Sequence, residues 1–199
     1  MDGFSASVEC GESMEEQSVD YNGFHHDTKC QNCFAFSPTG IIFFAVINAP
    51  GAWHDSQVVL PLAKAVNDHI GDYALCVDSG FSRSGDMFGK FVGPISRKRK
   101  RNLAPILRNH ILLLAEKYIS LRQASEWGMR ALQGAFPRLK SRLPSNRIWR
   151  SEIIFCIVLI HNFRTNLMGL NQITAVFNPL YDEYINLQGY DKIRRYYEY

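Results

Sequence analysis

A long apolar run limits what this chain can fold into more than any other feature. Residues 41–47 read Ile-Ile-Phe-Phe-Ala-Val-Ile, and every one of these side chains is apolar. Such a run is typical of a strand whose two faces are both covered. A preceding strand is predicted over residues 30–36, because Ser37-Pro38-Thr39-Gly40 suits a tight reversal between the two. We therefore expect a hairpin, over residues 30–36 and 41–48, with helices on each side of its sheet.

Helices and one further strand follow the hairpin. Asp55 or Ser56 suits the cap of a short helical turn, and Pro61 suits the first position of a helix that ends near His69. Residues 73–77 predict a short buried strand that ends at Asp78. Apolar residues at helical spacing predict three later helices, over residues 103–118, 121–139 and 148–167.

The order of these elements predicts an α/β fold with a mixed sheet flanked by helices. A length of 199 residues and a hydrophobic fraction of 46% suit one ordered domain, which we place at residues 1–163 with a tail at 164–199. Residues 3–29 are polar and lack a period, so they predict a loop. Asp78, just beyond a central strand, lies where ligands usually bind in α/β sheets.

Three carboxylates, Asp2, Asp78 and Glu126, are candidate metal ligands. Such a set can hold two divalent cations that activate water and stabilise the leaving oxygen of a phosphodiester. Each residue also has a plainer interpretation. Asp78 suits a turn ahead of Ser79-Gly80, and Glu126 can be a solvated helix residue paired with Arg130.

Six short motifs, in order along the chain, carry a family resemblance. They are Met1-Asp2-Gly3, Tyr21-Asn22-Gly23-Phe24, Pro50-Gly51-Ala52-Trp53-His54-Asp55-Ser56, Asp78-Ser79-Gly80-Phe81, Phe136-Pro137-Arg138-Leu139-Lys140 and Ile160-His161-Asn162-Phe163. Together they resemble the PIF/Harbinger-type transposases of the DDE endonuclease superfamily. The resemblance implies a ribonuclease-H-like fold, DNA as the substrate, and Mg²⁺ or Mn²⁺ as the cofactor for endonuclease and strand-transfer chemistry.

The resemblance assigns metal binding to Asp2 and Asp78, while the third ligand departs from the pattern. Many members carry the acidic residue at the position that Gln133 occupies here, and Gln133 has no carboxylate. Glu126 lies close to two helical turns earlier, so it shares a helix face with Gln133 and is favoured as the ligand. Pro137 replaces the family's glycine, and we expect it to end or kink the helix.

Two departures leave a second function open. The chain starts immediately before Asp2, so we expect the first strand of the fold to be missing and Asp2 to be poorly held. With Gln133, this supports an inactive transposon remnant or a domesticated module that binds DNA or protein without cutting. Because no helix-turn-helix segment precedes Asp2, a separate protein partner is expected to supply DNA recognition. Asp55 is a lesser metal-ligand candidate, since its position favours capping a helix.

A basic run is the candidate DNA-binding segment. It consists of Arg97, Lys98, Arg99, Lys100 and Arg101. Five consecutive cations can grip phosphates or direct nuclear import, although such runs are also common in solvated loops. Further basic residues, expected to hold a duplex near the carboxylates, are Arg138, Lys140, Arg142, Arg147 and Arg150. Net charge is only +3, so DNA binding must depend on such local patches.

The five cysteines predict reduced thiols in an intracellular protein, because they are odd in number and scattered. Cys30 and Cys33 have the spacing of half a zinc site. Since no second pair completes it, we interpret both as small apolar residues of a strand.

Overall fold

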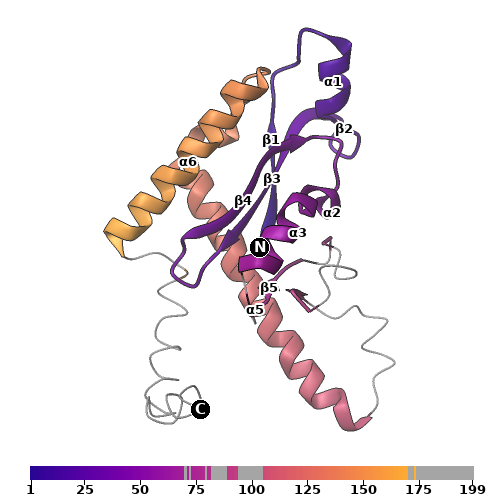
Figure 1. Ribbon diagram of the computed structural model, residues 1–199, viewed down its shortest axis with the longest axis vertical. Helices are drawn as coiled ribbons and strands as arrows, with labels where there is room; N and C mark the ends of the chain where they lie inside the picture. Colours follow the sequence, from indigo (N-terminus) through magenta and orange to yellow (C-terminus); the bar gives the residue numbers. More distant parts are fainter. Residues whose placement is uncertain are drawn as a thin grey trace.

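The computed structural model is an α/β fold built around a four-stranded antiparallel sheet (Figure 1). It describes residues 1–69, 71, 73–78, 80–81, 89–93, 105–169 and 173. The sheet strands are β1 (Asp2–Ser7), β2 (Tyr21–Asn22), β3 (Asp27–Phe36) and β4 (Ile42–Pro50). The first, second and fourth of these all pair with β3. The helices are α1 (Met14–Asp20), α2 (Asp55–Val58), α3 (Leu60–His69), α5 (Pro105–Ala135), the 3₁₀ turn η2 (Pro137–Lys140) and α6 (Arg147–Met168).

A short parallel pair, β5 (Leu75–Cys76) and β6 (Phe91–Val92), lies beside the main sheet. The two sheets are connected by a hydrogen bond of 2.7 Å from the Met1 nitrogen to the carbonyl oxygen of Cys76. The predicted strand before Asp78 is therefore present, although shorter than expected, while β6 was missed by the sequence analysis. Two residues are too few for a periodic pattern to be recognised.

Strand β3 separates two hydrophobic cores because successive side chains point to opposite faces of a sheet. Cys33 and Ala35 pack in one core with buried residues of α2 and α3. Cys30 and Phe34 pack in the other with buried residues of α5 and α6. Figure 1 shows these two pairs of helices on opposite sides of the sheet. The predicted α/β arrangement, with helices on each side, is confirmed.

The N-terminal segment corrects two predictions. Residues 3–29 are not a loop, because they form most of β1, all of α1 and β2, and the start of β3. The first strand is not missing either, since β1 begins at Asp2, opposite Phe34 of β3. Its sequence, Asp-Gly-Phe-Ser-Ala-Ser, has weak strand propensity, so the pairing with β3 determines its conformation. Ser13 caps α1 by accepting a hydrogen bond of 3.2 Å from the Glu16 nitrogen.

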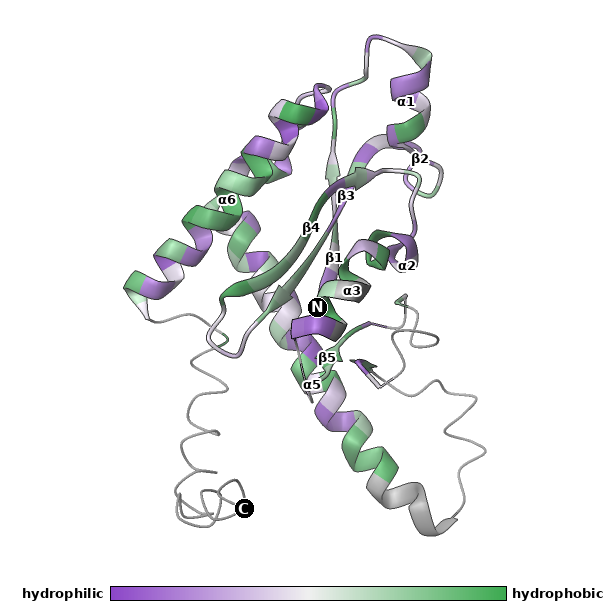
Figure 2. Cartoon of the chain, in the orientation of Figure 1, coloured by the Kyte–Doolittle hydropathy of each residue, from purple (hydrophilic) through white to green (hydrophobic). Residues whose placement is uncertain are grey.

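The predicted hairpin is confirmed as β3 and β4. The Ser37 nitrogen donates to the carbonyl oxygen of Ile41 at 2.8 Å, and Gly40 takes a φ of +82° in the turn. Figure 2 shows β4 as largely hydrophobic. Even so, Phe43 is 45% exposed, and Phe44 packs against the α2–α3 core. The prediction that both faces are covered is therefore wrong at the hairpin end of β4.

Helix α5 replaces the two separate helices predicted over residues 103–118 and 121–139. It runs without a break because Ile119-Ser120-Leu121 contains neither Gly nor Pro. It ends at Ala135, just before Pro137, as expected from the missing N–H of proline. Leu132 faces inward and is fully buried, whereas Ala131 is exposed.

Helix α6 confirms the third predicted helix, and two residues of its last motif bind the hairpin. The Asn162 side chain accepts from the Ile42 nitrogen and donates to the Ile42 carbonyl oxygen, both at 2.8 Å. His161 Nε2 lies 3.1 Å from the carbonyl oxygen of Gly40. Residues 153–160 are not buried all round, because Ile154 is buried while Phe155 is exposed.

Within the part of the chain that the structure describes, no helix combines the length and apolar character needed to cross a bilayer. Helix α6 continues past residue 163 to Met168. Most of the tail predicted at 164–199 lies outside the described residues, so the domain boundary stays a prediction.

Candidate functional site

Asp2 and Asp78 lie where the two sheets meet. Asp2 is the first residue of β1, and Asp78 follows β5 by two residues. The hydrogen bond from Met1 to Cys76 holds the start of β1 beside the end of β5. The Gly3 nitrogen donates to Asp2 Oδ1 at 2.9 Å. The strand that was expected to be missing therefore positions Asp2 by backbone pairing.

The electrostatic surroundings of Asp2 include the other two predicted ligands. Burial raises the pKa of the Asp2 carboxyl, and the charges of Asp78 and Glu126 add to this rise. The hydrogen bond from Gly3 and the α-amino group of Met1 oppose it. Like charges raise the pKa of a carboxyl only when they lie near it. The three carboxylates predicted from the sequence are thus neighbours in space.

Helix α5 brings Glu126 to the sheets through contacts about two helical turns apart, at Tyr118 and Ser125. Cys76 Sγ donates to the carbonyl oxygen of Tyr118 at 3.4 Å, which ties α5 to β5. Ser125, which is buried, accepts a 2.9 Å hydrogen bond from the Met1 nitrogen at its Oγ. Because helix residues recur on one face every three to four positions, Glu126 lies on the same side as these anchors.

Gly128 lets α5 approach the hairpin closely. A Cβ added at Gly128 would lie 2.7 Å from atoms of the Phe36 ring, closer than real contacts allow. The glycine two positions after Glu126 therefore has a packing role. It sets the depth at which the helix carrying this carboxylate sits against the end of β3.

Arg122 bridges two of the predicted ligands. Its guanidinium lies 2.8 Å from Glu126 Oε1 and 3.5 Å from Asp78 Oδ1. In the plainer interpretation Glu126 pairs with Arg130, but the structure shows Arg122 in that place. The Arg122–Glu126 spacing of four residues was a usable signal, because such pairs meet on a helix surface. The contact with Asp78 depends on the tertiary fold and left no local signal.

Asp55 faces the carboxylates instead of capping a helix. His54 is the N-cap of α2, with its nitrogen donating to Gln57 Oε1 at 3.0 Å, so capping by Asp55 is wrong. Gly3 and Gly80 leave room for the Asp55 carboxylate. A Cβ added at Gly3 would lie 2.9 Å from one Asp55 carboxylate oxygen, and a Cβ added at Gly80 would lie 3.0 Å from the other. Burial raises the pKa of Asp55, the charge of Asp78 adds to the rise, and His54 opposes it.

The donor chemistry of this acidic cluster suits a hard divalent cation, because carboxylate oxygens are the preferred ligands of Mg²⁺ and Mn²⁺. In the observed positions, Arg122 forms ion pairs with two of these carboxylates, Asp78 and Glu126. Among the residues described, no group of three or more His, Cys, Asp or Glu side chains is placed to hold a metal ion. Movement of Arg122 away from Asp78 and Glu126 is therefore a condition for their joint use as ligands.

Three of the arginines expected to hold DNA form ion pairs with aspartates of the fold. Arg150 is fully buried and lies 3.0 Å from Asp20 Oδ2, Arg147 lies 3.2 Å from Asp20 Oδ1, and Arg142 lies 2.8 Å from Asp27 Oδ1. The prediction is wrong for Arg150, because a buried guanidinium cannot reach a phosphate. Arg138 and Lys140 are exposed on η2. The basic run Arg97 to Arg101 lies outside the described residues.

The cysteine prediction is confirmed in part. Cys30 and Cys33 are buried free thiols in the two opposite cores, so they do not face each other across a metal site. Burial raises the pKa of the Cys33 thiol to about 12, which keeps it protonated and unreactive at neutral pH.

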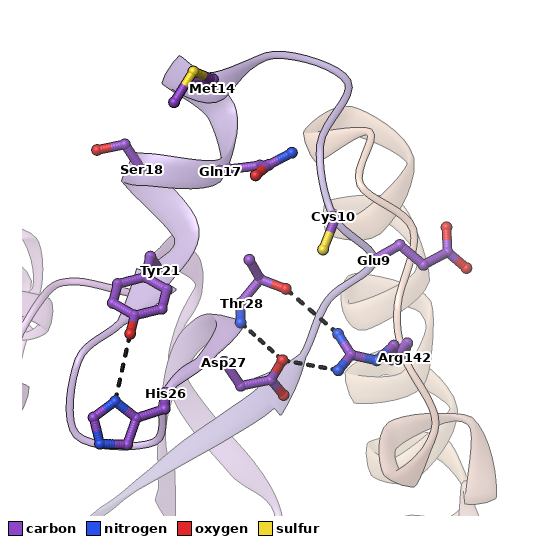
Figure 3. A pocket seen from close by; sticks show the side chains of 10 residues that line it. All are labelled: Glu9, Cys10, Met14, Gln17, Ser18, Tyr21, His26, Asp27, Thr28 and Arg142. Atoms are coloured by element: carbon purple, nitrogen blue, oxygen red, sulfur yellow. Dashed lines mark hydrogen bonds and ion pairs between the residues drawn. The ribbon is translucent and has the colours of Figure 1, made fainter.

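A hollow of about 670 Å³, which was not predicted, lies beyond the end of β1 that is far from Asp2. Figure 3 shows the residues that line it. It is lined by α1 and the start of β3, with Arg142 and Asp27 paired on one side. Tyr21 Oη and His26 Nδ1 lie 3.4 Å apart on the opposite side. The segment was expected to be a loop, so no pocket was predicted from it.

Comparison with known protein families identifies the class. The family model described as DDE superfamily endonuclease matches residues 1–162, which is most of the chain. The protein therefore belongs to the DDE superfamily endonucleases. This range includes the three predicted carboxylates, Arg122 and the closing His161-Asn162 motif. No match was found among curated proteins or among solved structures.

Proposed function

We propose that this chain is a PIF/Harbinger-type transposase domain that cuts DNA and transfers strands with the help of divalent metal ions. The observation that carries the proposal is the convergence of Asp2, Asp78 and Glu126 from β1, the end of β5 and α5. Three carboxylates from three separate elements are the donor set that two-metal phosphodiester chemistry needs. The family membership supports DNA as the substrate.

Each residue has a stated role in this proposal. Asp2, Asp78 and Glu126 hold Mg²⁺ or Mn²⁺, and Asp55 supports the site from behind Gly3 and Gly80 as a lesser candidate for a ligand. When bound, such cations would activate a water or a 3′ hydroxyl of the DNA as the nucleophile and would stabilise the leaving oxygen. The backbone pairing of β1 and the packing of Gly128 keep the carboxylates in place.

In this proposal, basic residues hold the DNA. The segment Arg97, Lys98, Arg99, Lys100 and Arg101 contacts phosphates, and the same residues suit a nuclear import signal. Exposed Arg138 and Lys140 add charge at η2. A separate DNA-binding protein then supplies recognition of the target sequence, and the nucleus is the place of action. In this proposal, residues 1–163 have a ribonuclease-H-like fold.

A plasmid-nicking assay tests the function. Supercoiled DNA is incubated with the purified chain and Mg²⁺ or Mn²⁺, and the nicked form is measured. Asp78→Asn is expected to lower the rate by more than about 100-fold, since changing even the supports of metal ligands costs about 10- to 100-fold. Asp68→Asn, an exposed carboxylate on α3, is the matched control and should leave the rate unchanged. Equal nicking by the Asp78 and Asp68 variants contradicts the assignment.

A second candidate function is a non-cutting remnant or domesticated module that binds DNA or a protein. The observation that favours it is the state of the acidic cluster, in which Arg122 holds both Asp78 and Glu126. Gln133 also favours the non-cutting module, because it occupies the position at which many family members carry a carboxylate. Absence of nicking with either metal, together with retained DNA binding in a gel-shift measurement, supports this candidate over the enzyme.

A further inference from the structure

We infer that Arg122 is a built-in counterion of the candidate metal site. It holds the Asp78 and Glu126 carboxylates while no divalent cation is bound, and it is displaced from them when one binds. This inference rests on the proposed function, because the site it regulates is the proposed metal site. It goes further by assigning a role to a cationic residue that the resemblance leaves without one.

The geometry places one guanidinium across two structural elements. Glu126 lies one turn further along α5, while Asp78 follows β5. A guanidinium is planar and carries several N–H donors, so it can bind two carboxylates at once, which a lysine ammonium does less well. Arg122 therefore links the helix to the parallel strand pair at the point where the site is formed.

The charges explain why a counterion is needed. The two carboxylate oxygens of Asp55 lie 2.9 Å and 3.0 Å from Cβ positions built on Gly3 and Gly80, of which the first is next to Asp2 in the chain and the second is two residues after Asp78. Without a cation, Asp78 and Glu126 add two more negative charges to the same place. An arginine remains protonated at any physiological pH, so its positive charge is always present. Arg122 thus reduces the repulsion in the metal-free protein.

The same contacts compete with metal binding. Arg122 uses Asp78 Oδ1 and Glu126 Oε1, which are atoms that a hard divalent cation also prefers. Its positive charge further disfavours a second cation nearby. The Arg122 side chain is 31% exposed, so it can turn toward solvent. Exposed ion pairs are weak, so the free energy needed to release Arg122 is small.

The first test is made without metal. Thermal unfolding of the full chain in EDTA is compared for Arg122→Gln, Glu126→Gln and the double variant. Loss of the counterion should lower the midpoint by about 1–3 °C. The effect of Arg122→Gln should shrink in the Glu126→Gln background, because the nearer of its two negative partners is already gone. An unchanged or raised midpoint in Arg122→Gln overturns the counterion role.

The second test is Mn²⁺ binding by isothermal titration calorimetry. Arg122→Gln should bind Mn²⁺ about 5- to 10-fold more tightly than the unchanged chain. Arg122→Lys keeps the charge and should show a smaller gain. Arg130→Gln, on the same helix and exposed, is the matched control and should bind like the unchanged chain. Weaker binding by Arg122→Gln overturns the inference and shows that Arg122 positions the ligands.

One outcome separates this inference from the proposed function. If the EDTA experiment shows coupling between Arg122 and Glu126 but no form of the chain binds Mn²⁺, the metal site is wrong. Arg122 is then a permanent ion pair, and the displacement step is overturned with the site. If the unchanged chain binds Mn²⁺ and Arg122→Gln binds it equally, the metal site stands and the inference alone fails.

Discussion

Arg150 places a full positive charge inside the protein, with a side chain that is 0% exposed. It donates to Asp20 Oδ2 at 3.0 Å, to the Asn48 side chain and to the Pro144 carbonyl oxygen at 3.3 Å. These partners connect α6 with α1 and β4. A buried charge is tolerated only when it is paired and hydrogen-bonded, so this network holds together three parts of the fold.

Arg147 provides a matched comparison for Arg150, because both pair with Asp20. Arg150→Met should lower the free energy of unfolding by about 3–5 kcal/mol, since it leaves a nearly buried carboxylate without its closest cation. Arg147→Met should lower the free energy of unfolding by less than about 1 kcal/mol, because 47% of the Arg147 side chain is exposed. Urea unfolding followed by circular dichroism measures both, and equal losses contradict the argument.

Asp55 makes the stability of the chain depend on pH. Its pKa is raised from 3.8, chiefly by burial and then by Asp78, so the folded chain binds more protons than the unfolded chain just above pH 3.8. Stability therefore falls as pH rises from 3.8 through the raised pKa, and the loss persists at neutral pH. In EDTA at pH 7, Asp55→Asn should raise the unfolding midpoint, whereas at pH 3 it should have little effect.

Asp27 provides the opposite control for that measurement. Burial acts to raise its pKa, but the hydrogen bond and charge of Arg142 hold the pKa below its usual value. Its contribution is present above pH 3.8 and is lost as pH falls through the lowered pKa. Asp27→Asn should therefore lower the midpoint at pH 7. If both variants shift the midpoint in the same direction, the charge-based explanation is wrong.

At the scale of elements, α5 determines whether the site is assembled. The helix carries Arg122, Glu126 and Gly128, and its contact with Phe36 fixes how deeply it packs. The tolerance at this contact is small, because a ring cannot yield as the end of a flexible side chain can. A displacement of α5 moves Glu126 away from Asp2, on β1, and from Asp78, which follows β5.

Two glycines of α5 test this dependence. Gly128→Ala places a Cβ 2.7 Å from the Phe36 ring and should destabilise the fold by about 1–3 kcal/mol. Gly134→Ala meets no atom within 4 Å and should stabilise it by about 0.5–1 kcal/mol, since alanine is the better helix former. Chemical unfolding measures both changes. A gain of stability in both variants would show that helix propensity outweighs the contact with Phe36 and would contradict the packing role of Gly128.

Local sequence patterns account for the central elements and not for those held by distant partners. The hairpin and α6 were predicted because their apolar residues and turn signals are strong on their own. β1 was missed because its small residues become a strand only by pairing with β3. Arg150 was predicted to face DNA because its partner could not be recognised from the sequence. That partner, Asp20, is 130 positions away in the chain. Arginine without a visible partner is usually exposed.

At the scale of the whole molecule, the candidate site lies where the antiparallel sheet meets the parallel pair (Figure 1). The motifs indicated Asp2 and Asp78, and the helix face shared with Gln133 indicated Glu126; the structure brings the three carboxylates near one another, while their role as metal ligands stays a prediction. The bridging position of Arg122 was not predictable in the same way, because it requires α5 and β5 to be placed relative to each other. Assembly of the site therefore depends on the tertiary fold.

The amide of Asn162 has a consequence for how this molecule meets other molecules. By pairing with both the N–H and the C=O of Ile42, it imitates the peptide group of a neighbouring strand. A strand edge with unsatisfied backbone groups is a template for intermolecular β-pairing and aggregation. Asn162 occupies that edge at the start of β4, so the residue that fastens the last helix also protects the sheet from strand addition.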